Sequence, residues 1–154
     1  MTPALRIALE RPDQPDVIAL IEALDAYQAP LYPAESNHLL DLSALLQPEV
    51  LFAVARDAQG EAIGCAASVL KPGYAELKRM YVRPECRGLG AAKQLLQFLE
   101  HETLKGGRDR LMLETGILQP EALGLYERWG FVRRGPFGDY AEDPLSVFME
   151  KRLR

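Results

Sequence analysis

Residues 75–96 read AELKRMYVRPECRGLGAAKQLL, and this stretch decides how the rest of the chain is interpreted. Residues 75–82 have the β-branched, aromatic and apolar content of a strand, and Arg83-Pro84-Glu85 interrupts it. Residues 87–92, RGLGAA, then open a helix. Small residues at a helix start leave several backbone N–H groups unpartnered, with the positive end of the helix dipole behind them. The stretch therefore predicts a binding site for a phosphate or pyrophosphate group.

Two other glycine-rich phosphate loops are excluded by the residues after the glycines. Lys93 occupies the third-glycine position of a GxGxxG dinucleotide fingerprint, and no βαβ unit with an acidic residue after the next strand is evident. No Gly-Lys-Ser/Thr is present there, so the P-loop pattern fails as well. Basic residues crowd around the stretch, as a polyanionic ligand requires: Lys78, Arg79, Arg83, Arg87 and Lys93. A solvated, charged strand end is an equally good interpretation of any one of them.

Composition restricts the class of protein. The chain has 154 residues, of which 48% are apolar and 26% charged, and this favours a single domain over residues 1–154. Its formal charge of −4 argues against nucleic acid as a partner. No apolar run approaches the roughly 20 residues of a membrane span, and no signal-peptide pattern is present, so we expect a cytoplasmic protein with no membrane partner. Two cysteines and two histidines make no convincing disulfide or zinc pattern, so we expect no metal. The oligomeric state stays open, with a homodimer as one option.

The periodicity of apolar residues predicts the remaining elements. Residues 5–9 alternate as a first strand, and a helix follows through residue 24. Residues 27–33 contain two prolines and cannot continue this helix, and a short second helix ends at Pro48. Further strands are expected at 50–56, 62–71, 74–82, 110–115 and 147–153, and further helices at 89–103 and 119–129. The order of these elements predicts an α+β sandwich with a mixed sheet.

Three elements together resemble the GCN5-related N-acetyltransferase (GNAT) superfamily. The loop matches its R/Q-x-x-G-x-G/A motif through Arg87, Gly90 and Ala92, and the strand before the loop lies at the expected distance. Residues 119–131, QPEALGLYERWGF, are similar to the family pattern N-x-x-A-x-x-L-Y-x-x-x-G-F. The resemblance covers most of the chain and points to a subgroup of small bacterial acetyltransferases. It implies a mixed, mostly antiparallel central sheet flanked by helices.

The resemblance implies a site for acetyl-coenzyme A that is built mainly from backbone. In the family the loop binds the pyrophosphate, and a bulged strand, here Met80, Tyr81 and Val82, holds the pantetheine and polarises the thioester carbonyl. Gln119, in place of the usual asparagine, keeps an amide that can bond the pantetheine. The implied cofactor-binding set is Met80, Tyr81, Val82, Arg87, Gly88, Leu89, Gly90, Ala91, Ala92 and Gln119.

An amine that attacks a thioester must be neutral, and the leaving thiolate needs a proton. Glu76 lies eleven residues before Arg87, the offset at which the superfamily's histone acetyltransferases carry their general base. A strand carboxylate paired with Lys78 or Arg79 is the alternative interpretation. Tyr126 matches the helix tyrosine that protonates the thiolate in many family members. With an ordinary pKa of about 10, its hydroxyl is protonated at pH 7 and can donate.

The family places its acceptor site after the first helix, where this chain carries Tyr27, Tyr32, Ser36 and His38. The acceptor is expected to be an amine of a small molecule or peptide. The implied function is acetyl transfer from acetyl-coenzyme A to a primary amine by direct attack in a ternary complex. The alternative is a non-catalytic acyl-coenzyme A-binding regulatory module, and the presence of both Glu76 and Tyr126 favours the enzyme.

Overall fold

A seven-stranded sheet forms the centre of the computed structural model, which describes residues 5–31 and 42–154. The strands are β1 (Arg6–Leu9), β2 (Val50–Arg56), β3 (Ala62–Lys71), β4 (Tyr74–Val82), β5 (Arg110–Gly116), β6 (Val132–Arg134) and β7 (Ser146–Arg152). Their order across the sheet is β1-β2-β3-β4-β5-β7-β6. Neighbouring strands are antiparallel except β4 and β5, which are parallel. The expected mixed, mostly antiparallel sheet is confirmed.

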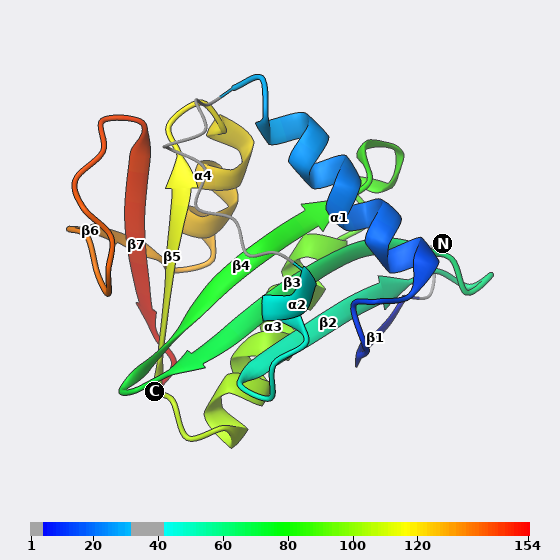
Figure 1. Ribbon diagram of the computed structural model, residues 1–154, viewed down its shortest axis with the longest axis horizontal. Coiled ribbons are helices and arrows are strands. Elements are labelled where there is room, and N and C mark those ends of the chain that lie inside the picture. Colours follow the sequence, from blue (N-terminus) through cyan, green and yellow to red (C-terminus); the bar gives the residue numbers. More distant parts are fainter. Residues whose placement is uncertain (1–4, 32–41) are drawn as a thin grey trace.

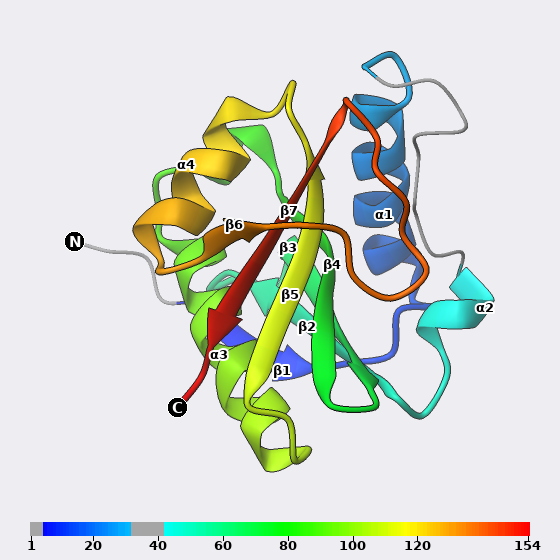
Figure 2. The same cartoon turned by 90° about the vertical axis from the view of Figure 1, so that its left-hand side faces the viewer.

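Helices cover both faces of this sheet (Figure 1). α1 (Pro15–Gln28) and the single turn α2 (Leu42–Leu45) lie on one face, and α3 (Ala91–Lys105) and α4 (Pro120–Arg128) lie on the other (Figure 2). The loop between β6 and β7 runs over the α1 face (Figure 2). Within the described ranges no helix combines the length and the apolar character needed to cross a bilayer.

Alternation along the strands explains how both faces are filled, because successive side chains of a strand point to opposite sides. Ala75 and Leu77 of β4 pack on the α3 face with Leu95 and Leu99. On the α1 face, helix residues such as Leu20 pack against β2 and β3. A separate cluster under the β6–β7 loop joins Met112, Phe137 and Phe148, with Tyr74 and Tyr140 against it. Full burial of one such large apolar side chain contributes about 1.5–3 kcal/mol.

Most elements lie within a residue or two of the expected bounds, with four differences. The first helix, α1, continues to Gln28, so Tyr27 and Gln28, which were expected to lie outside it, form its last residues, because the first proline comes only at Pro30. The helix after the glycine loop begins only at Ala91, because Gly88 and Gly90 both adopt positive φ, at 89° and 83°. β6 was not predicted, since its three residues are all exposed and show no alternation. The second helix is seen only as the turn Leu42–Leu45, and its expected beginning lies outside the described residues.

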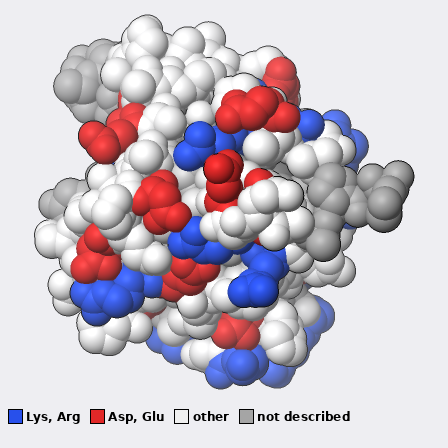
Figure 3. Space-filling model, turned by 90° about the vertical axis from the view of Figure 1, so that its right-hand side faces the viewer, with Lys and Arg blue, Asp and Glu red and all other residues white. Residues whose placement is uncertain are grey.

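The β1 edge of the sheet is joined to α1 by ion pairs. In β2, Nη2 of Arg56 lies 2.8 Å from Oε1 of Glu10, and its Nη1 lies 2.7 Å from Oδ2 of Asp16. Hydrogen bonds from Arg56 lower the pKa of both carboxyl groups. Figure 3 shows that charged side chains of both signs are interspersed on the face that carries this edge.

Candidate active site

A cleft of about 680 Å³ opens beside the second half of β4. Four elements line it: the end of α1, residues 80–82 of β4, the glycine loop with the first turn of α3, and one face of α4. The cleft thus brings the loop and the downstream helix of the sequence motif together at the strand that precedes them.

The cleft exists because β4 and β5 separate after a short paired segment (Figure 1). Their register runs only from Ala75↔Leu111 to Leu77↔Leu113. Beyond this point the β5-facing backbone edge of β4 borders the cleft at residues 80–82. An unpaired strand edge is a site at which an extended, amide-containing ligand can add as a further strand.

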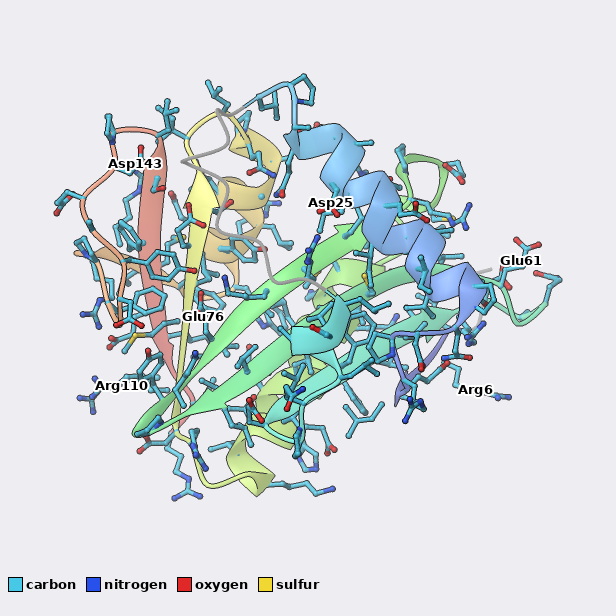
Figure 4. All side chains as sticks on the ribbon, in the orientation of Figure 1. Arg6, Asp25, Glu61, Glu76, Arg110 and Asp143 are labelled. Carbon is cyan, nitrogen blue, oxygen red and sulfur yellow. The ribbon has the colours of Figure 1, made fainter. Side chains whose placement is uncertain are left out.

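A bulge at Arg79 sets the direction of this free edge. The register with β3 shifts between Cys65 and Ala67, where β4 holds an extra residue. Among the described residues other than glycine, Arg79 alone has a positive φ, at 60°. This conformation costs about 1–3 kcal/mol and persists only when the surroundings hold it. The buried Arg79 guanidinium pairs with Asp25, labelled on α1 in Figure 4, so α1 holds the bulge.

The glycine loop presents a row of backbone donors to the cleft. Gln94 donates its N–H to the Gly90 carbonyl at 3.0 Å, whereas the N–H groups of residues 88–93 have no acceptor within the described chain. A Cβ added at Gly88 meets no atom within 4 Å, and one at Gly90 meets only the Gln94 amide nitrogen, at 3.8 Å. Because the space beside both glycines is open, an anion can approach these donors closely. The loop can therefore hold a phosphate or pyrophosphate group.

Three basic side chains, Arg87, Lys93 and Arg128, add positive charge to the lining. Arg87 reaches across the mouth of the cleft: its Nε donates to the Val82 carbonyl at 3.4 Å, and Nη1 lies 3.7 Å from Glu121 of α4. An ion pair this exposed is worth about 0–1 kcal/mol. A phosphate can therefore replace Glu121 as the partner of Arg87 at little cost.

Helix α4 divides its side chains between the cleft and the core. Ala122, Leu125 and Arg128 line the cleft, and Gln119 precedes the helix with its side-chain oxygen accepting the Gly116 N–H at 3.3 Å. Tyr126 does not line the cleft; its buried ring meets the edge of Phe131 at 5.6 Å between centroids. Burial raises the pKa of the Tyr126 hydroxyl, so this group holds its proton at neutral pH.

Glu76 points to the opposite face from α3, since its neighbours Ala75 and Leu77 face that helix. Figure 4 labels it where β4 and β5 lie close together. The residue is 4% exposed. Its Oε2 accepts the hydroxyl proton of Tyr140 at 2.5 Å and lies 3.3 Å from the Lys78 ammonium. Of the two pairings that the sequence left open, Lys78 is the one formed, because Arg79 pairs with Asp25.

The structure gathers most of the expected cofactor residues around this cleft, together with Tyr27 of the expected acceptor set. Lining it are Tyr27, Met80, Tyr81, Val82, Arg87, Gly88, Gly90, Ala91, Ala92 and Gln119. Leu89, Glu76 and Tyr126 are not among its lining residues, and Tyr32, Ser36 and His38 lie outside the described part of the chain. Within residues 5–31 and 42–154 no three His, Cys, Asp or Glu side chains gather as metal ligands would.

Sequence reasoning missed two polar residues. Arg128 lies three residues beyond Leu125, which in turn lies three beyond Ala122, so helical spacing along this helix could have found it. Tyr140, which hydrogen-bonds to Glu76, comes after Gly138-Asp139 in an irregular loop, and no periodic pattern marks it.

Comparison with known proteins agrees with this geometry. Residues 17–131 match the acetyltransferase (GNAT) family. The chain is 49% identical to a protein named IAA acetyltransferase from Azospirillum brasilense, over 98% of this chain and 99% of that one. A crystal structure from Klebsiella pneumoniae, assigned as an acyl-CoA N-acyltransferase, has a TM-score of 0.86 at 43% identity and covers 97% of this chain and 98% of its own.

A more distant structure shares the fold. PaiA N-acetyltransferase from Thermoplasma acidophilum, solved in complex with coenzyme A, has a TM-score of 0.73 at 21% identity and covers 97% of this chain and 99% of its own. The family match spans most of the chain, and the Azospirillum protein aligns over nearly its whole length. This chain therefore belongs to the acetyltransferase (GNAT) family and is an acyltransferase.

Proposed function

We propose that the protein transfers the acetyl group of acetyl-coenzyme A to a primary amine of a small molecule or peptide, by direct attack in a ternary complex. The observation that carries this proposal is the cleft, where the donors at the start of α3 and the free edge of β4 face one space. Coenzyme A is a pyrophosphate joined to a chain of amides, so it requires an anion cradle at one end and a strand-like edge along the other.

In this proposal residues 88–93 hold the pyrophosphate, with Arg87 as an added positive charge. The backbone of residues 80–82 and the Gln119 amide hold the pantetheine. Acetyl-coenzyme A supplies an activated acyl group when it is bound. A backbone N–H of residues 80–82, at the edge of β4 that borders the cleft, stabilises the negative charge that develops on the carbonyl oxygen.

Glu76 and Tyr126 divide the proton transfers. Glu76 removes a proton from the acceptor ammonium, directly or through a water. Tyr126 gives one to the departing thiolate, a role that requires its buried hydroxyl to reach the cleft from the core side of α4. Glu76 lies on the α1 face of the sheet, and the cleft is bordered by the end of α1 as well as by the starts of α3 and α4. The acceptor therefore enters from the α1 face and meets the thioester where β4 and β5 separate. Tyr27 supports this direction of entry, because it lies in the last turn of α1, is 44% exposed and lines the cleft.

The test is a panel of amines assayed for free-thiol release from acetyl-coenzyme A, with the acetylated product identified by mass spectrometry. The panel includes α-amines of dipeptides, alkylamines and amino acids, and also IAA, after which the Azospirillum relative is named. We expect thiol release that depends on one class of amine and matches the product in amount. Tight coenzyme A binding without acetylation of any amine would support the regulatory module instead.

A further inference from the structure

Three side chains form a closed polar triangle beneath the β6–β7 loop. The Tyr140 hydroxyl donates to Glu76 Oε2 at 2.5 Å, the Lys78 ammonium donates to the Tyr140 oxygen at 2.8 Å, and Lys78 Nζ lies 3.3 Å from Glu76 Oε2. The side chains of Glu76 and Lys78 are only 6% and 13% exposed. Tyr140 comes from a loop 64 residues away in the chain, so the fold brings it to the strand.

The chemistry of the three groups sets the direction of these bonds. A lysine ammonium can only donate hydrogen bonds, and an ionised carboxylate can only accept them. The single hydroxyl proton of Tyr140 is therefore directed to Glu76 while its oxygen accepts from Lys78. The hydrogen bond from Tyr140 and the ion pair with Lys78 are both formed at Oε2 of the Glu76 carboxylate.

We propose that Tyr140 is a positioning residue for the acceptor-side base: it fixes Glu76 through Oε2 and thereby presents Oε1 to the acceptor ammonium. The inference rests on the proposed function, in which Glu76 is the base. The proton of the ammonium passes to Oε1, directly or through a water, and the nitrogen lone pair that remains is the nucleophile. An anchored carboxylate delivers this oxygen in one orientation, whereas a freely rotating one spends part of its time elsewhere.

The surroundings of Tyr140 are rigid enough for this task. Its ring lies 5.2 Å from Phe137 and 5.5 Å from Phe148 between centroids, and the Tyr140 N–H donates to the Phe137 carbonyl at 3.1 Å. Where the loop ends, Ser146 begins β7 and its hydroxyl donates to Glu114 of β5 at 2.7 Å. Burial and the charge of Glu76 raise the pKa of Tyr140, so the donor keeps its proton at neutral and mildly alkaline pH.

The test removes one hydroxyl group and keeps the ring. Tyr140→Phe is compared with wild type, with Glu76→Gln and with the double variant, using the fastest amine of the panel as the probe. Tyr74→Phe is the matched control: Tyr74 packs against Phe137 in the same cluster at 5.8 Å, and no hydrogen bond joins its hydroxyl to Glu76. Calorimetric titration with coenzyme A shows whether each variant keeps a folded cleft.

Tyr140→Phe loses a hydrogen bond to a charged group, so its kcat should fall by about 10–100-fold. Its affinity for coenzyme A should stay within about twofold of wild type. Tyr74→Phe should retain full kcat. Adding Tyr140→Phe to Glu76→Gln should cause no further loss, because the hydroxyl acts only through that carboxylate. Full kcat in Tyr140→Phe would overturn the role of Tyr140 and leave Glu76 as the base. An equal loss of kcat when Tyr140→Phe is added to wild type and to Glu76→Gln would do the same. Full kcat in Glu76→Gln would overturn the base itself, and with it the role of Tyr140.

Discussion

Replacing Gly90 by valine is expected to remove coenzyme A binding while leaving the protein folded. Gly90 has a φ of 83°, and the nearest atom to an added Cβ is 3.8 Å away, so the fold has room for a side chain. The folded state is destabilised because valine must adopt the left-handed backbone conformation of Gly90, which costs about 1–2 kcal/mol. At about 2–4 °C per kcal/mol for a chain of this length, Tm should fall by about 2–8 °C.

The loss of affinity should be much larger than the loss of stability. The valine methyl groups would occupy the open space through which an anion reaches the N–H groups of residues 88–93. If two charge-assisted hydrogen bonds are lost at about 1.5–3 kcal/mol each, binding weakens by about 3–6 kcal/mol. At about 1.4 kcal/mol per factor of ten, this raises Kd by more than about 100-fold.

Gly107 provides a matched control at the other end of the same helix. It lies just beyond α3, has the same φ of 83°, and an added Cβ there meets no atom within 4 Å. Gly107 is not among the residues that line the cleft. Gly90→Val and Gly107→Val should therefore lose similar stability in thermal unfolding, and only Gly90→Val should lose coenzyme A affinity by calorimetry. Equal affinities in the two variants would refute the assignment of the loop as the pyrophosphate site.

The site and the ion pairs at the sheet edge lead to three further predictions. Coenzyme A at a hundredfold excess over Kd should stabilise the protein by about 2.7 kcal/mol, seen as a higher Tm, and equal protection by ATP or NAD would favour a nucleotide site. Glu76→Gln should lower kcat by about 10²–10⁴-fold. Its kcat should rise again at high pH, where the amine is already neutral, whereas the kcat of Tyr126→Phe should stay low. A loss of kcat in Glu76→Gln that is the same at every pH would make the carboxylate structural. Arg56 lowers the pKa values of Glu10 and Asp16 in the folded protein. The two carboxylates therefore stabilise the folded state above their unfolded-state pKa values of about 4, and this stabilisation is lost as the pH falls through the lower folded-state values. In wild type the free energy of unfolding, measured with urea, should be higher at pH 6 than at pH 3, and Arg56→Gln should make this difference smaller. An unchanged difference would contradict the linkage.

Element order could be predicted because each strand from β2 to β5 carries its own apolar pattern, with a glycine, proline or acidic turn between neighbours. The glycine loop could be predicted for the same reason, since its chemistry is local: small residues, positive φ and a helix start lie within a few positions. The three-residue strand β6 escaped because all its side chains are exposed and it pairs only with β7.

The features that a sequence pattern could not supply depend on residues far apart in the chain. The family resemblance led us to expect a bulge in this strand, but the strand pattern itself does not mark its position at Arg79, whose positive φ is held by Asp25, 54 residues earlier. Tyr140 reaches Glu76 only because the β6–β7 loop folds over β4 and β5. Leu125 and Tyr126 are neighbours in the chain, yet only Leu125 lines the cleft and Tyr126 is buried in the core, a difference that depends on how α4 packs.

The most direct measurement is the initial rate with acetyl-coenzyme A and the accepted amine varied against each other. Direct attack in a ternary complex predicts intersecting double-reciprocal lines, with no acetyl group left on the protein. Among the described residues that line the cleft, the one thiol is that of Cys86, and burial raises its pKa, so it is a weak nucleophile at neutral pH. Parallel lines, together with acetylated Cys86 detected by mass spectrometry, would contradict the account.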